Sequence, residues 1–236
     1  MQQFFISDPI LLDSQIKLNE AITYQCLTVL RYTNDTKIIL VNDDGVKSIA
    51  SLIIKGKELY AKIDQIILND SVTKTKVILI QALIRKEKFE WVLQKATECG
   101  VDTIIPLILE RNVVKWTQDE SKLVRWQKIV QEAAEQSKRN TIPKVLTPID
   151  LNEIDQFKSS LNLFAYEKED QLLLKNALST EDSISIVIGC EGGFTSNEYN
   201  SLINKGFISV SLGSRIYRAE TATIVALTVI DTVLGI

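Results

Sequence analysis

The sequence predicts an α/β protein whose main part is a mostly parallel sheet covered by helices, with a small all-β module before it. Its 236 residues suit two unequal domains. The first 70 residues are rich in β-branched side chains and turn signals, whereas from residue 76 onward apolar runs alternate with amphipathic stretches. We therefore expect domains at 1–70 and 71–236, joined by a polar linker at 69–75.

The N-terminal module contains one clear hairpin signal. The run KIILV at 37–41 is followed by the turn residues 42–45 (Asn-Asp-Asp-Gly) and then by a second apolar run near 48–54. Two extended runs separated by such a turn are typical of paired antiparallel strands.

The larger domain is predicted from alternating periods of hydrophobicity. Near-continuous apolar runs such as KVILIQAL indicate strands buried on both faces, and apolar residues at helical spacing indicate helices that cover them. Gly100 marks the end of the first helix. We expect strands at 76–83, 103–109, 161–166, 184–188 and 207–212, and helices at 87–99, 118–138, 170–178, 196–205 and 219–234.

Composition removes several kinds of chemistry. The chain has no histidine, which excludes Ser-His-Asp catalysis and His-ligated zinc, and we expect no metal site. Cys26, Cys99 and Cys190 form no CxxC motif and indicate reduced thiols of a cytoplasmic protein. No apolar run approaches the roughly 18 residues of a spanning helix, and the first residues lack the features of a signal peptide, so we expect no membrane partner.

Charge is distributed unevenly along the chain. The net charge is −3, yet residues 74–144 contain 14 basic and 9 acidic residues, a net charge of +5. Within this region, 125–145 offers Lys128, Lys138, Arg139 and Lys144 to phosphates. A solvated amphipathic helix is the alternative interpretation, and the segment by itself favours it.

The segment IGCEGGFTSNE (188–198) follows a predicted buried strand and precedes a helix, the position where open α/β sheets bind ligands. Its three glycines permit backbone angles and close approaches that a side chain would block. Residues 195–198 (Thr-Ser-Asn-Glu) fit a capping box that starts the next helix. A tight turn that merely needs glycines is an equally good interpretation of this segment alone.

A second candidate segment, SLGSRIYRAETA (211–222), also lies between a strand and a helix. Arg215, Arg218 and Glu220 stand beside an almost wholly apolar helix, where charged groups need partners or a function. An ion pair at the start of that helix is the structural alternative. The final helix has little polar face, which indicates either a core helix or a dimer interface.

Taken together, these segments resemble the bacterial RsmE family, which methylates uracil N3 in small-subunit ribosomal RNA. The matching stretches are QKATECGVDTIIPLILER (94–111), WQKIVQEAAEQSKR (126–139), IGCEGGF (188–194) and LGSRIYRAETA (212–222). The resemblance implies a PUA-like β-barrel followed by a SPOUT methyltransferase domain with a C-terminal trefoil knot. It also implies a homodimer that uses S-adenosyl-L-methionine and acts on 16S ribosomal RNA.

The resemblance also assigns site residues. Its cofactor loops map onto Ile188, Gly189, Glu191, Gly192, Gly193, Leu212, Gly213, Ile216, Tyr217, Ala219, Thr221 and Ala222, and its RNA contacts onto Arg31, Arg111, Lys138 and Arg139. The sequence departs from the family at four places: Gln3 replaces a frequent Arg, Tyr24-Gln25 a frequent His, Cys190 a Pro and Tyr217 a Leu.

Three charged residues are candidates for the chemistry. We expect Glu191 or Glu220, with a raised pKa, to accept the N3 proton, and Arg218 to stabilise negative charge on the uracil oxygens. A purely structural role for all three is the alternative. Two other functions fit the sequence: a SPOUT methyltransferase acting on transfer RNA, and a noncatalytic RNA-binding assembly factor.

Overall fold

The computed structural model describes residues 1–67, 75–117 and 119–235. The chain divides into two compact units, and each is described by itself. Unit 1 comprises Met1–Val72 together with Ala134–Thr141, and unit 2 comprises Thr73–Ala133 and Ile142–Ile236. The linker predicted at 69–75 lies outside the described residues except for Thr75.

Unit 1 is built on a five-stranded sheet with a small hydrophobic core that includes Phe4, Leu40 and Leu52. The predicted hairpin is confirmed, and Gly45 at its turn has a φ of 76°. β1 pairs with β3 in parallel, and the other pairs are antiparallel. In sheet order the strands are β1 (Gln3–Ile6), β3 (Lys37–Asn42), β4 (Lys47–Lys55), β5 (Glu58–Ile67) and β2 (Gln15–Lys17).

A short helix, α1 (Glu20–Tyr24), continues into a π-helical turn at Gln25–Val29, and neither was predicted from the sequence. The turn ends at Val29, and Arg31, two residues further on, has a left-handed φ of 55°. Cys26 belongs to this turn and is fully buried, and burial raises the pKa of its thiol to about 11.

Unit 2 contains a parallel sheet in which every pair of strands runs the same way. All five predicted strands are present. In sheet order the strands are β12 (Ile208–Val210), β10 (Leu161–Ala165), β11 (Ser183–Ile188), β6 (Lys76–Ala82), β7 (Thr103–Ile108) and β8 (Lys144–Val145), with β9 (Ile149–Asp150) also paired to β7.

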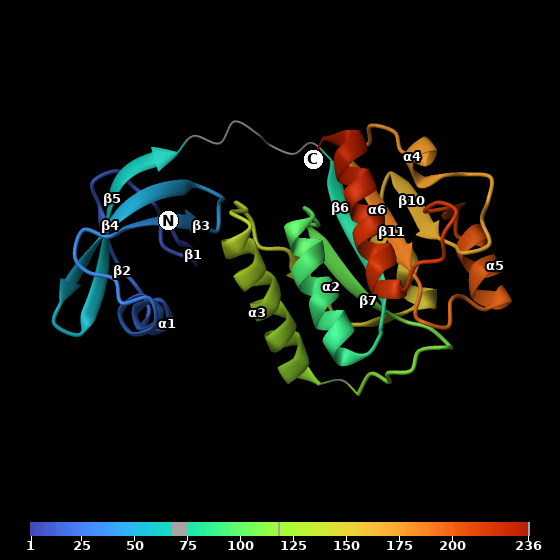
Figure 1. The fold of residues 1–236 in the computed structure, drawn as a ribbon, viewed down its shortest axis with the longest axis horizontal. Coiled ribbons are helices and arrows are strands. Elements are labelled where there is room, and N and C mark those ends of the chain that lie inside the picture. The colour runs from blue at the N-terminus through green and yellow to red at the C-terminus, as the bar shows by residue number, and fades with distance from the viewer. Residues whose placement is uncertain (68–74, 118, 236) are drawn as a thin grey trace. The chain divides into compact units, whose positions relative to one another are not determined.

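Helices cover this sheet because their apolar faces pack on its buried strands. α2 and α6 lie side by side over the sheet (Figure 1). Gly100 follows α2 with a φ of 89°, as expected of a helix stop. The helices are α2 (Lys86–Glu98), α3 (Glu120–Gln136), α4 (Leu174–Ala177), α5 (Ser196–Asn204) and α6 (Ala219–Leu234), with a 3₁₀ segment at Leu151–Phe157.

The helix predicted at 170–178 is wrong over most of its length, because only α4 is helical there. The backbone around Leu173 instead forms a parallel bridge to Ser211. Leu174 N donates to Ser211 O at 2.8 Å, and Ser211 N donates to Leu172 O at 2.8 Å. These bonds use the groups that would otherwise bond within a helix.

Within the described part of the chain, no helix is both long enough and apolar enough to span a membrane.

Candidate functional site

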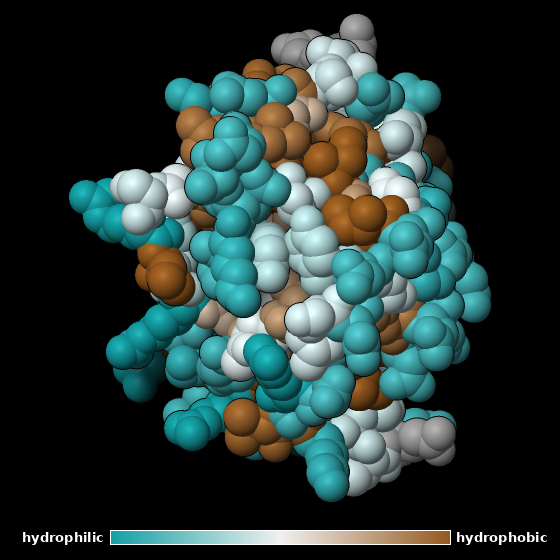
Figure 2. Space-filling view, turned by 90° about the vertical axis from the view of Figure 1, so that its right-hand side faces the viewer, coloured by the Kyte–Doolittle hydropathy of each residue, from teal (hydrophilic) through white to brown (hydrophobic). Residues whose placement is uncertain are grey.

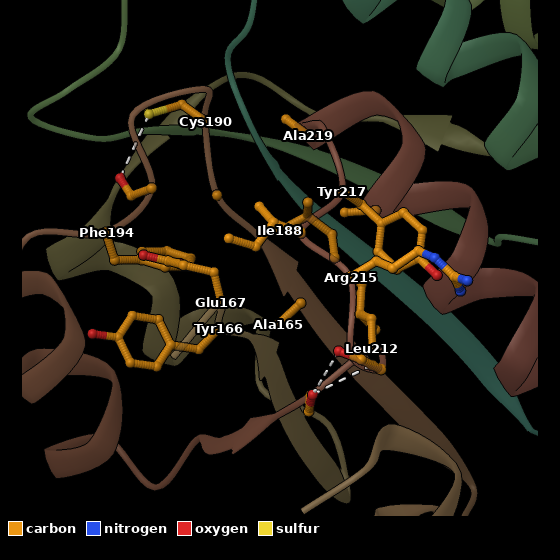
Figure 3. Close-up of a pocket in the computed structure, with 16 residues that line it drawn as sticks. Ala165, Tyr166, Glu167, Ile188, Cys190, Phe194, Leu212, Arg215, Tyr217 and Ala219 are labelled. Atoms are coloured by element: carbon orange, nitrogen blue, oxygen red, sulfur yellow. Dashed lines mark hydrogen bonds between the residues drawn. The ribbon is translucent and has the colours of Figure 1, made fainter. Parts of the chain in front are cut away.

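A cleft opens at the carboxyl ends of three neighbouring strands of unit 2, β10, β11 and β12. The space in and above it, including its open mouth, amounts to about 580 Å³. In Figure 3, Tyr166 and Phe194 lie on one side, Leu212 and Tyr217 on the other, and Ile188 between them. The lining residues are Ala165, Tyr166, Glu167, Ile188, Gly189, Cys190, Gly193, Phe194, Ser211, Leu212, Gly213, Arg215, Ile216, Tyr217, Ala219 and Ala222.

The loop after β11 needs glycine at two positions. A Cβ on Gly189 would lie 3.1 Å from the ring of Phe194, so a side chain there would press on the cleft wall. Gly193 has a φ of 64°, and a Cβ on it would lie 3.1 Å from Glu167 Oε1. The glycines therefore shape this wall of the cleft.

Cys190 lies in the same loop and lines the cleft. Its Sγ donates to Gly193 O at 3.7 Å (Figure 3). Burial raises the pKa of this thiol, which keeps it protonated and unreactive near neutral pH.

Arg111 holds the same loop from outside the cleft. Its Nη1 donates to Gly192 O at 2.9 Å and to Phe194 O at 3.4 Å. A Cβ on Gly192 would lie 3.0 Å from Arg111 Cβ, so this glycine permits the close approach of the arginine. Arg111 thus has an intramolecular role, and its predicted contact with RNA stays a prediction.

The predicted capping box at the start of α5 is confirmed. Thr195 Oγ1 accepts from Glu198 N at 3.2 Å, and Glu198 Oε2 accepts from Thr195 N at 2.7 Å. Glu198 Oε1 also accepts from Glu110 N at 2.7 Å, which ties the end of the loop to the segment after β7. The helix start thereby fixes one end of the glycine loop.

The loop after β12 closes the other side of the cleft. Ser211 Oγ accepts from Gly213 N at 3.3 Å, and Gly213 has a φ of 124°. Ile216 is 84% exposed although it lines the cleft.

On the face of unit 2 that carries α5, apolar side chains gather in patches among hydrophilic ones (Figure 2).

The lining residues at the end of β10 and just after it were not predicted as site residues from the sequence. Ala165, Tyr166 and Glu167 line the middle of the cleft because β10 lies between β11 and β12 in the sheet. Tyr166 is fixed there by its ring contact with Tyr199, at 4.6 Å between centroids. The signal available was the predicted strand at 161–166, whose carboxyl end had to lie at the same edge.

The predicted cofactor residues fall into two groups. Nine line the cleft: Ile188, Gly189, Gly193, Leu212, Gly213, Ile216, Tyr217, Ala219 and Ala222. Glu191, Gly192 and Thr221 do not line it, and Glu191 and Thr221 are exposed.

The predicted catalytic residues lie near the cleft but outside its lining. Arg218 is exposed and precedes α6, whereas Glu220 lies in the first turn of α6 and pairs with Lys88 of α2 at 2.9 Å. Thr223 Oγ1 donates to Gln81 Oε1, a fully buried bond that ties this end of α6 to β6.

The expectation of a raised pKa for Glu220 is wrong. Burial acts to raise the pKa of this carboxyl, but the hydrogen bond from Lys88, together with a backbone donor and the charges of Lys88 and Arg218, lowers it below the ordinary value. Glu220 therefore forms the ion pair that the sequence left open as an alternative.

Three of the four predicted RNA contacts belong to unit 1. Arg31 and Lys138 are exposed and both left-handed, with φ of 55° and 62°. Gln3 is fully buried, and its Nε2 donates to Arg139 O at 2.6 Å. Lys47 Nζ donates to Lys138 O at 3.0 Å. The buried Gln3 thus holds the backbone of the basic turn at residues 138–139 through this hydrogen bond.

The fold and the cleft define an α/β protein with a candidate small-ligand site at the carboxyl edge of its sheet. Residues 71–231 match the family model of the RNA methyltransferase domain. The chain therefore belongs to this RNA methyltransferase family, within the group of ribosomal RNA small subunit methyltransferases E.

Relatives and solved structures agree. The ribosomal RNA small subunit methyltransferase E of Mesomycoplasma hyopneumoniae is 37% identical over 71% of this chain and 74% of its own, and that of Bacillus subtilis 31% over 88% and 86%. The crystal structure of the Neisseria gonorrhoeae enzyme bound to S-adenosyl methionine is 31% identical, covers 98% of this chain and 97% of its own, and has a TM-score of 0.90.

Proposed function

We propose that this chain uses S-adenosylmethionine to methylate N3 of a uracil in the 16S RNA of the small ribosomal subunit. One observation carries the proposal: a glycine-shaped cleft lies at three strand ends in a chain similar along 98% of its length to an enzyme bound to that cofactor.

The residues of the cleft fit an adenosyl ligand. Most lining residues are apolar or small, and Gly189 and Gly193 add no side chains of their own to the wall. Backbone groups around Gly213 and the side chains of Leu212 and Tyr217 would hold the ligand, together with the other lining residues that the sequence predicted. When bound, S-adenosylmethionine supplies a methyl group carried on a positively charged sulfur.

The chain's own residues then handle the uracil proton and charge. N3 must lose its proton before or during methylation. Because Glu220 forms an ion pair with Lys88, the proton acceptor in this proposal is Glu191, an exposed carboxylate in the loop after β11. Arg218 stabilises the negative charge on the uracil oxygens. Glu220 positions the start of α6.

RNA binding falls to both units in this proposal. Residues 1–70 would form a PUA-like barrel, and Arg31 of that barrel would hold RNA together with Lys138 and Arg139, which belong to the same compact unit. Residues 71–236 would form a SPOUT domain with a C-terminal trefoil knot, and Arg111 would contribute its RNA contact. Two copies would pair through α6. The 46% exposure of the apolar Val233 on this helix supports such a contact.

Methyl transfer to small ribosomal subunits from labelled S-adenosylmethionine tests the proposal. Gly193→Val introduces a β-branched residue at a left-handed position, and we expect cofactor binding to be lost. Arg218→Ala should keep cofactor binding and lower kcat about 100-fold. Arg218→Ala at wild-type rate would contradict the electrostatic role. Unchanged uracil methylation of 16S RNA in a strain lacking the gene would contradict the assigned substrate.

A further inference from the structure

Glu167 stands apart from the other charged groups at the site. Among the described residues that line the cleft, Glu167 and Arg215 alone carry a formal charge. The rest of the lining is uncharged, and its polar side chains are the hydroxyls of Tyr166, Ser211 and Tyr217. Glu167 is therefore the one anionic side chain among the described lining residues that a cationic ligand would meet.

The loop that carries Glu167 is fixed on both sides. Tyr166 N donates to Val210 O at 3.0 Å, immediately before it. Two residues later, the Glu169 carboxylate accepts from Gln171 N at 2.9 Å, and its Oε2 accepts from Ser209 Oγ at 2.5 Å. The Glu167 side chain is thus presented from an anchored backbone.

The Glu167 carboxylate occupies the space that a side chain at residue 193 would fill. A Cβ on Gly193 would lie 3.1 Å from Oε1 and 3.4 Å from Oε2. The carboxylate therefore lies where the loops after β10 and β11 meet, beside Phe194 (Figure 3). Glycine at 193 is needed both for its φ and for this neighbour.

No described residue forms a hydrogen bond or ion pair with this carboxylate. Two other carboxylates of unit 2 do have partners: Glu198 accepts from two backbone amides, and Glu220 pairs with Lys88. Glu167 is exposed at the cleft, so its carboxylate is free to meet a cation of a ligand, and covering it with that ligand strengthens the attraction by removing water.

We infer that the Glu167 carboxylate binds a cationic group of the methyl donor, its sulfonium or its ammonium. This inference rests on the proposed function, because it concerns the same cleft. It makes Glu167 a residue that selects the charged donor over neutral adenosyl compounds.

Titration calorimetry of the full chain tests the inference with three ligands: S-adenosylmethionine, its neutral-sulfur product S-adenosylhomocysteine, and adenosine. For Glu167→Gln we expect S-adenosylmethionine to bind about fivefold more weakly and adenosine unchanged. A larger loss for S-adenosylmethionine than for the product identifies the sulfonium, and an equal loss identifies the ammonium. Glu167→Asp, which keeps the charge, should retain part of the affinity.

Asp170→Asn is the matched control, since Asp170 is an exposed carboxylate of the same loop that does not line the cleft. The inference is overturned if Glu167→Gln binds S-adenosylmethionine as the wild type does, or weakens adenosine by the same factor. If the wild type itself binds none of the three ligands, the proposed function fails instead.

Discussion

At the scale of single residues, Glu220 shows how a charged group next to an apolar helix is accommodated. It lies in the first turn of α6, where a carboxylate interacts favourably with the helix dipole, and it pairs with Lys88. Its second oxygen, Oε2, is buried with no hydrogen-bond partner among the described residues. The pair therefore joins α2 to α6 beside the cleft loop.

Lys88→Met should destabilise the protein by about 1 kcal/mol at pH 7, because it leaves the Glu220 carboxylate without its cation. Glu220 has a pKa below its ordinary value of 4.5, so its stabilisation is present above that pH and is lost as the pH falls through the folded-state pKa. The difference between variant and wild type should shrink over that acid range, measured by urea unfolding.

Lys86→Met is the control for this experiment, because Lys86 is an exposed lysine of the same helix without an ion pair among the described residues. A loss for Lys88→Met that is equally large at pH 3 and pH 7 would assign the effect to helix packing and not to charge.

Residue patterns predicted part of the cleft well. The glycines and apolar residues after β11 and β12 were recognisable because their loops carry unusual composition. The ion pair of Glu220 with Lys88 was not, because it joins helices far apart in the sequence. The same holds for Arg111, whose partners lie some 80 residues away on the chain.

At the scale of elements, the predicted strands and most helices could be derived from hydrophobic period alone. The order of the strands could not, because it depends on tertiary packing. β10 precedes β11 in the chain but lies between β11 and β12 in the sheet, which places Glu167 in the middle of the cleft. The helix at 170–178 failed for a similar reason, since its backbone pairs with Ser211.

The Arg111 contact to the glycine loop gives an element-scale prediction. Arg111→Ala should weaken S-adenosylmethionine binding about fivefold, on the order of 1 kcal/mol, because the loop loses donors to Gly192 O and Phe194 O. Calorimetry measures the effect, with Arg125→Ala, which breaks a pair with Glu90 elsewhere, as the control.

The same variant separates the two roles considered for Arg111. If it is instead a phosphate contact, cofactor affinity should stay at the wild-type level. The slope of log K for RNA against log salt concentration should then become shallower by about one.

At the scale of the whole molecule, the chain has two separate hydrophobic cores, one in each unit. The change of pattern near residue 70 led to the predicted boundary there, which stays a prediction. That Ala134–Thr141 belong to unit 1 could not be predicted, because it depends on contacts such as Gln3 to the Arg139 carbonyl.

Two cores predict two unfolding transitions in calorimetry. S-adenosylmethionine at about 100 times its Kd should stabilise the transition of unit 2 by about 2.7 kcal/mol, because every residue lining the cleft belongs to that unit. The transition of unit 1 should keep its midpoint. A single transition that the ligand shifts as a whole would contradict this independence.

Because Ala134–Thr141 belong to unit 1, the order of translation limits when that unit can finish folding. When the first 72 residues leave the ribosome, the amide of Gln3 and the ammonium of Lys47 still lack their acceptors at residues 138–140. Those acceptors are synthesised about 65 residues later, a delay of several seconds at ordinary elongation rates. The unit that is translated first therefore cannot be completed first, because residues 73–133 of the second unit must emerge before the last part of the N-terminal unit is made.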